Sequence, residues 1–184
     1  MSSPTDNELM REVRDGDLAK LGTLFERHHK KLYNFFLRLT GKVVVSEDLV
    51  QEVFFRILKY KHTYRGESQF TVWMFKIARN ARVDHFQKTK NMEPTDVEEA
   101  IESSDLNPDQ EIVSKQDQQI LHAALNKLSD EEREVLLLSR FSGIKYKEIA
   151  NIFDCLEGTI KARVHRAIKK LRDTFYELSG ESAL

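Results

Sequence analysis

The sequence has very little of what several functional classes require. Its 184 residues include a single cysteine, Cys155, which cannot form an intramolecular disulfide or complete a zinc site by itself. No stretch approaches the roughly 18 to 20 apolar residues of a membrane span. The polar, acidic residues 1–12 do not resemble a secretory signal. These absences exclude a disulfide scaffold, and they predict a protein of the reducing cytoplasm with no direct membrane insertion.

Turn and strand signals are also scarce. Three prolines and seven glycines in 184 residues favour few turns and long helices. Segments that alternate apolar and polar residues between turns, which are typical of strands, are absent from the sequence. A hydrophobic fraction of 40% with 32% charged residues is that of a globular protein. The sequence therefore predicts an all-α fold.

The formal net charge of −1 conceals an uneven distribution of charge. Residues 93–111 contain eight acidic side chains, no Lys or Arg, two prolines and almost no periodic apolar pattern. This composition predicts a flexible acidic linker, which we place at residues 92–111. The linker separates two small helical domains, residues 6–91 and residues 112–178, which are net basic in consequence.

Helices account for the N-terminal block. Apolar residues at helical spacing run from Leu18 to Leu39 and stop at Gly41, as helices often do at a glycine. Ser46 is expected to cap the next helix. A turn at residues 64–68 then precedes a helix over residues 70–88. The residues predicted to be buried on these two helices are Leu49, Val50, Val53, Phe54, Ile57 and Leu58, followed by Trp73, Ile77, Ala81 and Val83.

The C-terminal block begins with two further helices. The first is expected over residues 112–128. The second starts at Ser129, which forms a capping box with Glu132, and ends at Gly143.

A helix-turn-helix is predicted at the end of the chain. A short helix over residues 146–153, a break at 154–158 and a helix over 159–178 follow one another, and so brief a break is typical of that motif. Ala150 leaves room for the two helices to cross, and Cys155 is expected to be a small buried residue in the break. The core face of the last helix is predicted to be Ile160, Val164, Ala167, Ile168 and Leu171.

The opposite face of this last helix is positively charged. Residues 158–172 contain six Lys or Arg and no acid. An apolar back and a cationic front suit a helix that lies in the major groove of DNA. The alternative is an amphipathic helix whose charges only face solvent. The short preceding helix and Ala150 favour DNA binding.

Three motifs resemble those of one family in order and separation. Residues 146–150 (YKEIA) and 158–167 (GTIKARVHRA) resemble the promoter-binding helix-turn-helix of bacterial sigma factors. Residues 46–54 (SEDLVQEVF) resemble the helix by which these factors bind RNA polymerase, and residues 73–80 (WMFKIARN) resemble their promoter-melting segment. Two domains and a short linker resemble the extracytoplasmic-function (ECF) group, and the resemblance covers residues 18–171.

The resemblance implies a function and a set of partners. It implies a factor, not an enzyme, that brings core RNA polymerase to promoters in a stress or envelope response, with no cofactor or metal of its own. The implied partners are the clamp helices of the largest polymerase subunit, the flap of the second-largest subunit, promoter DNA and an anti-sigma factor.

The site residues that the resemblance implies form three groups. The group that binds core polymerase is Asp48, Gln51, Glu52 and Arg56. The group that holds the melted single strand, beginning in a loop that would receive an extruded base, is Tyr64, Arg65, Ser68, Gln69, Arg79, Asn80, Arg82 and Lys88. The group that binds the upstream promoter element is Tyr146, Lys147, Thr159, Lys161, Ala162, Arg163, His165, Arg166, Lys169 and Lys170.

Some positions depart from the family pattern. Lys145 stands where family members often have a capping Ser or Thr, and Ala162 stands where they often have Ser. His165 is likewise particular to this chain. The promoter sequence is therefore not carried over from the resemblance.

Two other functions fit parts of the sequence. One is an autonomous helix-turn-helix regulator whose N-terminal block senses a signal or dimerises. The other is a metal-dependent nuclease that uses Asp84 and His85, for which the sequence offers no third ligand. His28 and His29 point about 100° apart on a helix, so we interpret them as surface or interface residues and not as a metal site.

Overall fold

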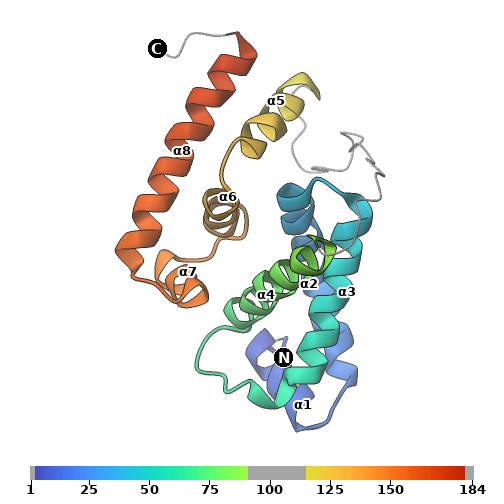
Figure 1. The fold of residues 1–184 in the computed structure, drawn as a ribbon. Coiled ribbons are helices and arrows are strands. Elements are labelled where there is room, and N and C mark those ends of the chain that lie inside the picture. The colour runs from blue at the N-terminus through green and yellow to red at the C-terminus, as the bar shows by residue number, and fades with distance from the viewer. Residues whose placement is uncertain (1–2, 91–114, 181–184) are drawn as a thin grey trace. The chain divides into compact units, whose positions relative to one another are not determined.

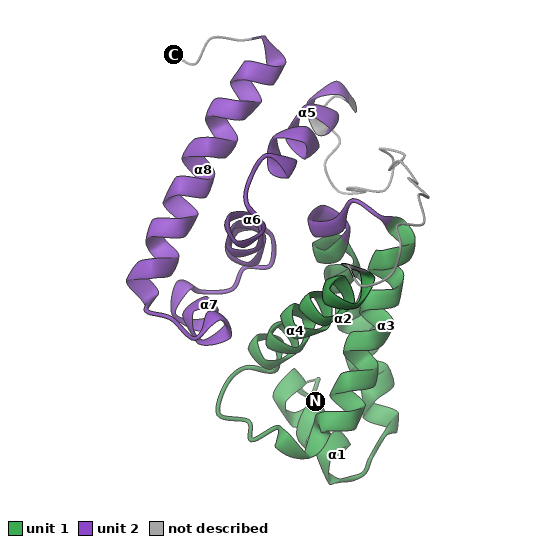
Figure 2. Cartoon of the chain, in the orientation of Figure 1, with its two compact units in different colours: residues 1–36, 43–99 green, residues 37–42, 100–184 purple. Residues whose placement is uncertain are grey.

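In a computed structural model of the chain, residues 3–90 and 115–180 are described, and every regular element within them is a helix (Figure 1). The prediction of an all-α fold is confirmed. The chain divides into two compact units, of which the first comprises residues 1–36 and 43–99 and the second residues 37–42 and 100–184 (Figure 2). The predicted linker at residues 92–111 lies outside the described residues.

The elements described in residues 3–90 are α1 (Asp6–Asp15), α2 (Ala19–Thr40), α3 (Val43–Tyr60), the short 3-10 turn η1 (Lys61–Thr63) and α4 (Phe70–Lys90). They form the first unit, except for residues 37–40 at the end of α2, which are assigned to the second. A capping box between Thr5 and Glu8 begins α1, and Gly16, at a φ of 119°, ends it.

The corner between α2 and α3 differs from the sequence prediction. Gly41 ends α2 at a positive φ of 69°, as expected, but α3 begins at Val43. Ser46 is therefore not a cap: it lies one turn inside α3 and is fully buried. The Thr40 hydroxyl accepts a hydrogen bond from the Lys42 amide at 3.2 Å, so the turn is completed before Ser46 is reached.

The core of the first unit confirms most of the predicted face of α3 and shifts that of α4. Leu58 is exposed, while the five other predicted residues of α3 are buried. On α4 the residues in the core are Phe70, Val72, Met74, Phe75, Ala78 and Ala81. Trp73, Ile77 and Val83 are only half-buried, so the predicted face was wrong at these three positions. These buried residues are spread over more than one side of α4, so the part of the helix surface that packs into the core is wider than a single apolar stripe.

His28 was interpreted as a surface or interface residue, and its burial shows that it does not lie at the surface. His28 is 7% exposed, because α1 and α4 cover it. Its Nε2 lies 2.7 Å from Oδ2 of Asp6 at the start of α1, and its ring lies 5.4 Å from that of Phe70. The residue therefore joins three helices of the first unit.

The second unit contains α5 (Lys115–Asn126), α6 (Asp130–Leu136), a π-helical turn η2 (Leu137–Phe141), α7 (Tyr146–Phe153) and α8 (Glu157–Ser179). The predicted capping box is present: the Ser129 hydroxyl accepts from the Glu132 amide, and Glu132 accepts from the Ser129 amide. Arg133 donates to the carbonyls of Leu125, Asn126 and Leu128, which fixes the end of α5 against α6.

The helix-turn-helix is made by α7 and α8. Asp154 ends α7 in the left-handed conformation, with a φ of 50°, and α8 already begins at Glu157. The break is thus shorter than predicted, and Glu157 and Gly158 belong to the helix as well. Ala150 is buried, as expected at the crossing, and so is the adjacent Ile149, but Cys155 is partly exposed and does not fill the core.

The buried face of α8 is narrower than predicted. Ile160, Val164 and Ala167 are buried, whereas Ile168 is 37% exposed and Leu171 is half-buried. About two turns of α8, residues 160–167, therefore pack closely against the rest of the second unit.

Candidate functional site

The predicted polymerase-binding residues lie on α3, and the structure divides them between two hollows. Asp48, Glu52 and Arg56 line a pocket of about 200 Å³ together with Asp84, His85 and Lys88 of α4. Their spacing of four residues places them on one side of the helix. Gln51 instead lines a second pocket, on the side of α3 that faces α2.

Arg56 ties α3 to α4. Its Nε donates to Glu52 at 2.6 Å, and its Nη1 donates to Asp84 at 2.7 Å. Partial burial disfavours its charge, but the hydrogen bonds that Arg56 donates to Glu52 and Asp84 outweigh burial and raise the pKa of Arg56 above its ordinary value. Because Asp84 is engaged in this pair, it is not presented as a metal ligand.

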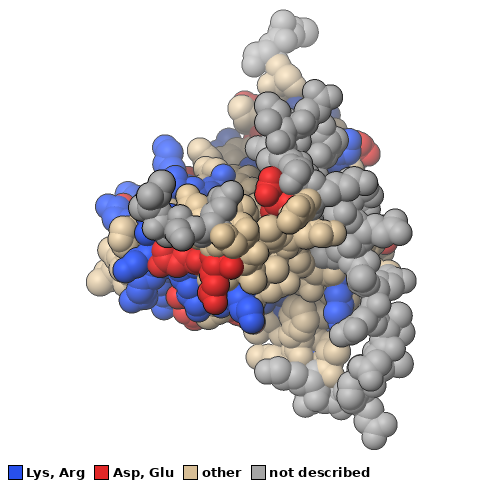
Figure 3. Space-filling view, turned by 90° about the horizontal axis from the view of Figure 1, so that it is seen from above, with Lys and Arg blue, Asp and Glu red and all other residues tan. Residues whose placement is uncertain are grey.

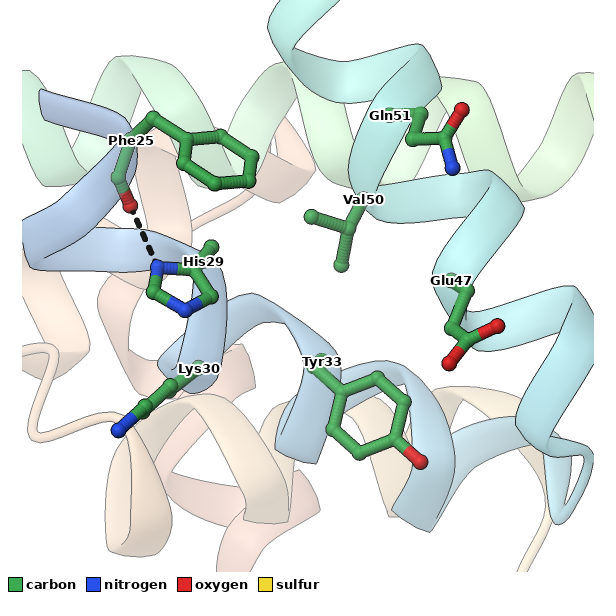
Figure 4. Close-up of a pocket in the computed structure, with 7 residues that line it drawn as sticks. All are labelled: Phe25, His29, Lys30, Tyr33, Glu47, Val50 and Gln51. Carbon is green, nitrogen blue, oxygen red and sulfur yellow. Dashed lines mark hydrogen bonds between the residues drawn. The ribbon is translucent and has the colours of Figure 1, made fainter. Parts of the chain in front are cut away.

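The second pocket, of about 410 Å³, lies between α2 and α3 (Figure 4). The His29 ring stacks on that of Phe25 with 4.8 Å between the ring centres, and its Nδ1 lies 2.8 Å from the Phe25 carbonyl oxygen. The pocket has aromatic walls and polar groups at its edges. Its lining residues are Phe25, His29, Lys30, Tyr33, Glu47, Val50 and Gln51.

The exposed surface of α3 also carries apolar side chains that sequence reasoning missed. Phe55 is 60% exposed and Val44 52%, while the adjacent Phe54 is buried. With Leu58, these residues continue the spacing of Asp48 and Gln51 along the helix at intervals of three and four. Exposed apolar residues in such a row mark an interaction surface more often than scattered ones do. Their spacing was visible in the sequence, but their exposure was not.

The loop before α4 presents some of its predicted residues and buries one. Arg65, Ser68 and Gln69 are exposed. Tyr64 is only 2% exposed: its ring lies 5.1 Å from that of Trp73 and 6.4 Å from that of Phe70. As described, the Tyr64 ring offers no face for a base to stack on, and this part of the prediction is wrong because two aromatic residues of α4 cover it.

The predicted single-strand residues of α4 are likewise unequal in exposure. Asn80 and Lys88 are exposed and Arg79 is half-buried, whereas Arg82 is 9% exposed and belongs to the interior. Of the predicted single-strand residues, those that are exposed are thus Arg65, Ser68, Gln69, Asn80 and Lys88.

The outward face of α8 carries the predicted upstream-element residues. Lys161, Ala162, His165, Arg166, Lys169 and Lys170 are exposed, Thr159 and Arg163 are half-exposed, and on α7 Lys147 is exposed and Tyr146 half-exposed. Lys145, which precedes α7, gives no side-chain cap, but its amide donates to the Glu148 carboxylate at 3.1 Å. The helix thus begins without the Ser or Thr that is usual in the resemblance.

Acidic side chains neutralise part of this basic face. Arg163 pairs with Glu131 at 3.3 Å, Lys170 with Glu132 at 3.4 Å, and Lys161 with Glu157 at 2.9 Å. In the described part of the chain, neither Arg166 nor Lys169 forms an ion pair. Figure 3 shows Lys and Arg lying directly beside Asp and Glu on the face it presents.

The carboxylate of Glu132 is held in its charged form. Its pKa is lowered from the ordinary value, first by the hydrogen bond from the Ser129 amide and then by Lys170. Glu132 therefore keeps its negative charge to a lower pH than an isolated glutamate does.

Two other kinds of site are absent from the described residues. Among residues 3–90 and 115–180, no group of three His, Cys, Asp or Glu is placed to hold a metal ion. Within the same residues, no helix is both long and apolar enough to cross a bilayer.

These features define a helical protein with a DNA-binding helix-turn-helix and a second helical unit, and comparison with known proteins gives the family. Residues 24–92 match the family model of sigma-70 region 2, and residues 118–171 match that of sigma-70 region 4. The chain is 28% identical over 173 residues to the ECF RNA polymerase sigma-E factor of Escherichia coli K12, covering 89% of this chain and 90% of that protein. It is 29% identical over 156 residues to the ECF sigma factor SigX of Bacillus subtilis 168, covering 81% of this chain and 80% of that protein.

Solved structures of sigma factors also resemble this chain. The sigma factor RpoE of Bartonella quintana, in complex with the anti-sigma factor NepR, is 29% identical with a TM-score of 0.69, covering 88% of this chain and 98% of that one. CnrH, in complex with the cytosolic domain of CnrY, has the same fold, with a TM-score of 0.71, 21% identity and coverage of 96% and 99%. The chain belongs to the sigma-70 family of RNA polymerase sigma factors, in its ECF group. Matches to both regions do not favour an autonomous regulator.

Proposed function

We propose that the three predicted groups of residues bind core polymerase, the melted single strand and the upstream promoter element, as the sequence resemblance implies. Within each group, the exposed side chains make the direct contacts. The observation that carries this proposal is the order of the surfaces along the chain. An exposed row of polar and apolar residues on α3 is followed by an exposed polar loop before α4 and by a cationic face on α8, on which Arg166 and Lys169 form no ion pair within the described residues. We propose domain limits of residues 6–91 and 112–178, joined by residues 92–111.

The α3 surface is proposed to bind the clamp helices of the largest polymerase subunit. Phe55 and Leu58 supply the apolar contact, and Asp48 and Gln51 supply polar contacts that fix orientation. Glu52 and Arg56 contribute differently from the prediction, because they hold each other and Asp84 and so shape this surface from its edge.

The loop before α4 and the exposed part of α4 are proposed to hold the melted non-template strand. A base outside the duplex needs hydrogen bonds to its edge, and a backbone phosphate needs a cation. Gln69 and Asn80 can provide the first and Arg65 and Lys88 the second, since all four are exposed.

The face of α8 is proposed to read the upstream promoter element. Arg166 is exposed and unpaired in the described part of the chain, and its fork is suited to guanine O6 and N7. Catalysis belongs to the polymerase, so this chain needs no active site, and it acts in the cytoplasm.

An anti-sigma partner is also proposed. Support comes from the Bartonella quintana relative, whose structure contains an anti-sigma factor. We infer that the partner covers the α3 row, because exposed Phe55 and Val44 are unfavourable in water when polymerase is absent. Pull-downs from unstressed cells should recover a small partner, and its displacement by a Phe55→Glu substitution would support this assignment. Recovery of the free chain alone would contradict it.

One reconstitution tests the whole assignment. The purified chain is combined with core RNA polymerase, and transcript start sites are mapped genome-wide. The chain should give starts that core enzyme alone does not give. An Asn80→Ala variant should form closed complexes normally and lose activity on duplex templates, with recovery on premelted ones. Equal loss on both templates would contradict the single-strand role.

A further inference from the structure

The side chain of Asn7 on helix α1 contacts the end of the loop formed by residues 64–69. The Oδ1 of Asn7 accepts a hydrogen bond from the Phe70 amide at 2.7 Å, and its Nδ2 donates to the Ser68 carbonyl at 3.3 Å. Both the donor and the acceptor of this amide are therefore used at the end of the loop. Asn7 also satisfies an amide at the start of α4 that has no partner within its helix.

Two further residues of the same face of α1 contact the rest of the loop. Arg14 Nη1 donates to the Tyr64 carbonyl at 3.4 Å. The Arg11 guanidinium lies on the backbone of Gly66, so closely that a Cβ there would lie 3.2 Å from the Arg11 Nε. Residues 7, 11 and 14 are spaced as one helical face. This face therefore follows the loop from beginning to end.

The helix that carries these residues is itself firmly held. Leu9, Met10 and Val13 are at most 1% exposed. Asp6 lies 2.8 Å from Arg27 and 2.7 Å from His28, both on α2. The contacts to the loop thus start from a firmly packed helix, whereas the loop has four exposed side chains and no regular structure of its own.

We propose that α1 sets the conformation of this loop, with Asn7 as a positioning residue, and thereby sets which base the loop prefers on the melted strand. The inference rests on the proposed role of the loop in strand capture. A loop that reads a base edge must hold Arg65 and Gln69 in one arrangement, and ordering a free loop costs conformational entropy at the moment of binding. Hydrogen bonds from α1 remove that cost beforehand.

Two substitutions separate positioning from folding. Asn7→Asp keeps an acceptor for the Phe70 amide and places a negative charge at the N-terminus of α4, which is favourable, but it loses the donor to the Ser68 carbonyl. Asn7→Ala loses both bonds. Thermal unfolding should show Asn7→Asp to be as stable as the natural chain. Glu12→Gln, on the same helix and away from the loop, is the matched control.

The readout is base discrimination by reconstituted holoenzyme. Forked, premelted templates carry each of the four bases in turn at every unpaired non-template position, and the affinity ratio of best to worst base is measured. Asn7→Ala should reduce this ratio by about threefold to tenfold and Asn7→Asp by less, since one hydrogen bond is retained. Binding to the duplex upstream element should not change, and Glu12→Gln should match the natural chain.

Companion variants in the loop keep the inference distinct from the proposed function. If Arg65→Ala and Gln69→Ala reduce discrimination while both Asn7 variants leave it unchanged, the loop reads the base without α1 and the inference is overturned. If the loop variants have no effect either, the loop is not the base site, and the proposed single-strand role fails with it.

Discussion

At the scale of single residues, pairing decides which cations of α8 are available to DNA. Arg166 and Lys170 are four residues apart and both exposed, but Lys170 is held by Glu132 at 3.4 Å. An exposed ion pair is weak, so DNA phosphates can displace the carboxylate. The displaced carboxylate still repels phosphate nearby, which reduces the net gain from Lys170.

The first prediction contrasts these two residues in holoenzyme. Arg166→Ala should weaken promoter binding by about 1 to 3 kcal/mol and relax the preference at one base pair, because a bidentate contact to guanine is lost. Lys170→Ala should weaken all sequences alike and lower the salt slope by less than about one. Affinities for single-base promoter variants at several salt concentrations provide the measurement.

A reciprocal variant controls this comparison. Glu132→Gln retains the capping interaction with Ser129 and removes the charge that faces Lys170. It should tighten binding to every sequence. If Arg166→Ala lowered the affinity for all promoter variants by one common factor, Arg166 would contact the DNA backbone and not a base. That result would contradict our assignment.

The second prediction concerns the pH dependence of stability and the Asp6 carboxylate. Burial raises its pKa, but hydrogen bonds from Arg27 and His28 outweigh burial and hold the pKa below its ordinary value of 3.8. A group with a depressed folded-state pKa stabilises the protein above the unfolded-state value and loses that contribution as the pH falls through the folded-state value. Asp6 therefore stabilises the first unit at neutral pH and loses this contribution progressively as the pH falls below about 4.

Asp6→Asn should lower the free energy of unfolding by about 1 kcal/mol at pH 7, and the difference from the natural chain should shrink as the pH approaches 3. Urea unfolding at a series of pH values measures it. Asp15→Asn, which removes a fully exposed partner of Arg14, should change little. A difference that grows on acidification would mean that Asp6 is not charged in the folded protein.

At the scale of whole helices, α3 presents two phenylalanines side by side with opposite roles. Phe54 is 8% exposed and packs edge-on against Phe25 at 4.9 Å, whereas Phe55 is 60% exposed. The third prediction uses this pair. Phe54→Ala should lower the free energy of unfolding by about 3 kcal/mol, because it removes a core side chain. Phe55→Ala should change stability by less than about 0.5 kcal/mol and weaken core polymerase binding about tenfold.

Chemical denaturation and a titration of labelled core polymerase measure the two effects. Val44→Ala, at the far end of the row, measures how much that end of the exposed surface contributes to polymerase binding. A Phe55→Ala variant that bound polymerase with unchanged affinity would remove the apolar row from the proposed interface.

The same helices show what local sequence could and could not predict. The capping box of Ser129 and the turn at Gly41 depend on residues within a few positions, and both predictions were confirmed. Ser46 was wrongly predicted as a cap because the turn at Thr40 starts α3 earlier. Periodicity identified the apolar side of α3, but it could not tell that Leu58 lies beyond the edge of the packed face.

Contacts between distant segments account for most of the remaining errors. His28 is buried because α1 and α4 cover it, and Tyr64 is covered by two aromatic residues of α4. Asn7 and Phe70 are 63 positions apart, and no pattern in the sequence links them. The family resemblance gave the order of the candidate sites. Which of their side chains reach solvent depends on tertiary packing, which the motifs do not encode.

At the scale of the whole molecule, the charge distribution bears on why a sigma factor with a basic recognition helix need not bind DNA by itself. The formal net charge is −1, although α8 is strongly cationic, because residues 93–111 hold eight acids. Net negative charge elsewhere on a small chain lowers its affinity for a polyanion through long-range repulsion, most strongly at low salt. The acidic residues would then restrain non-specific DNA binding until polymerase is present.

The last prediction tests this restraint by neutralising charge without changing length. Replacing the eight acids of residues 93–111 by their amides makes the formal net charge strongly positive. The free variant should bind random-sequence duplex DNA at least about tenfold more tightly at 50 mM salt than the natural chain does, and the difference should diminish at 300 mM as screening increases. Fluorescence anisotropy with the isolated chain gives the measurement. A scrambled order of the same residues, with all eight acids kept, is the control and should bind as weakly as the natural chain. If the amide variant bound DNA no better at low salt, recognition by α8 would be limited by its own paired cations, Lys161, Arg163 and Lys170, and not by the acidic segment.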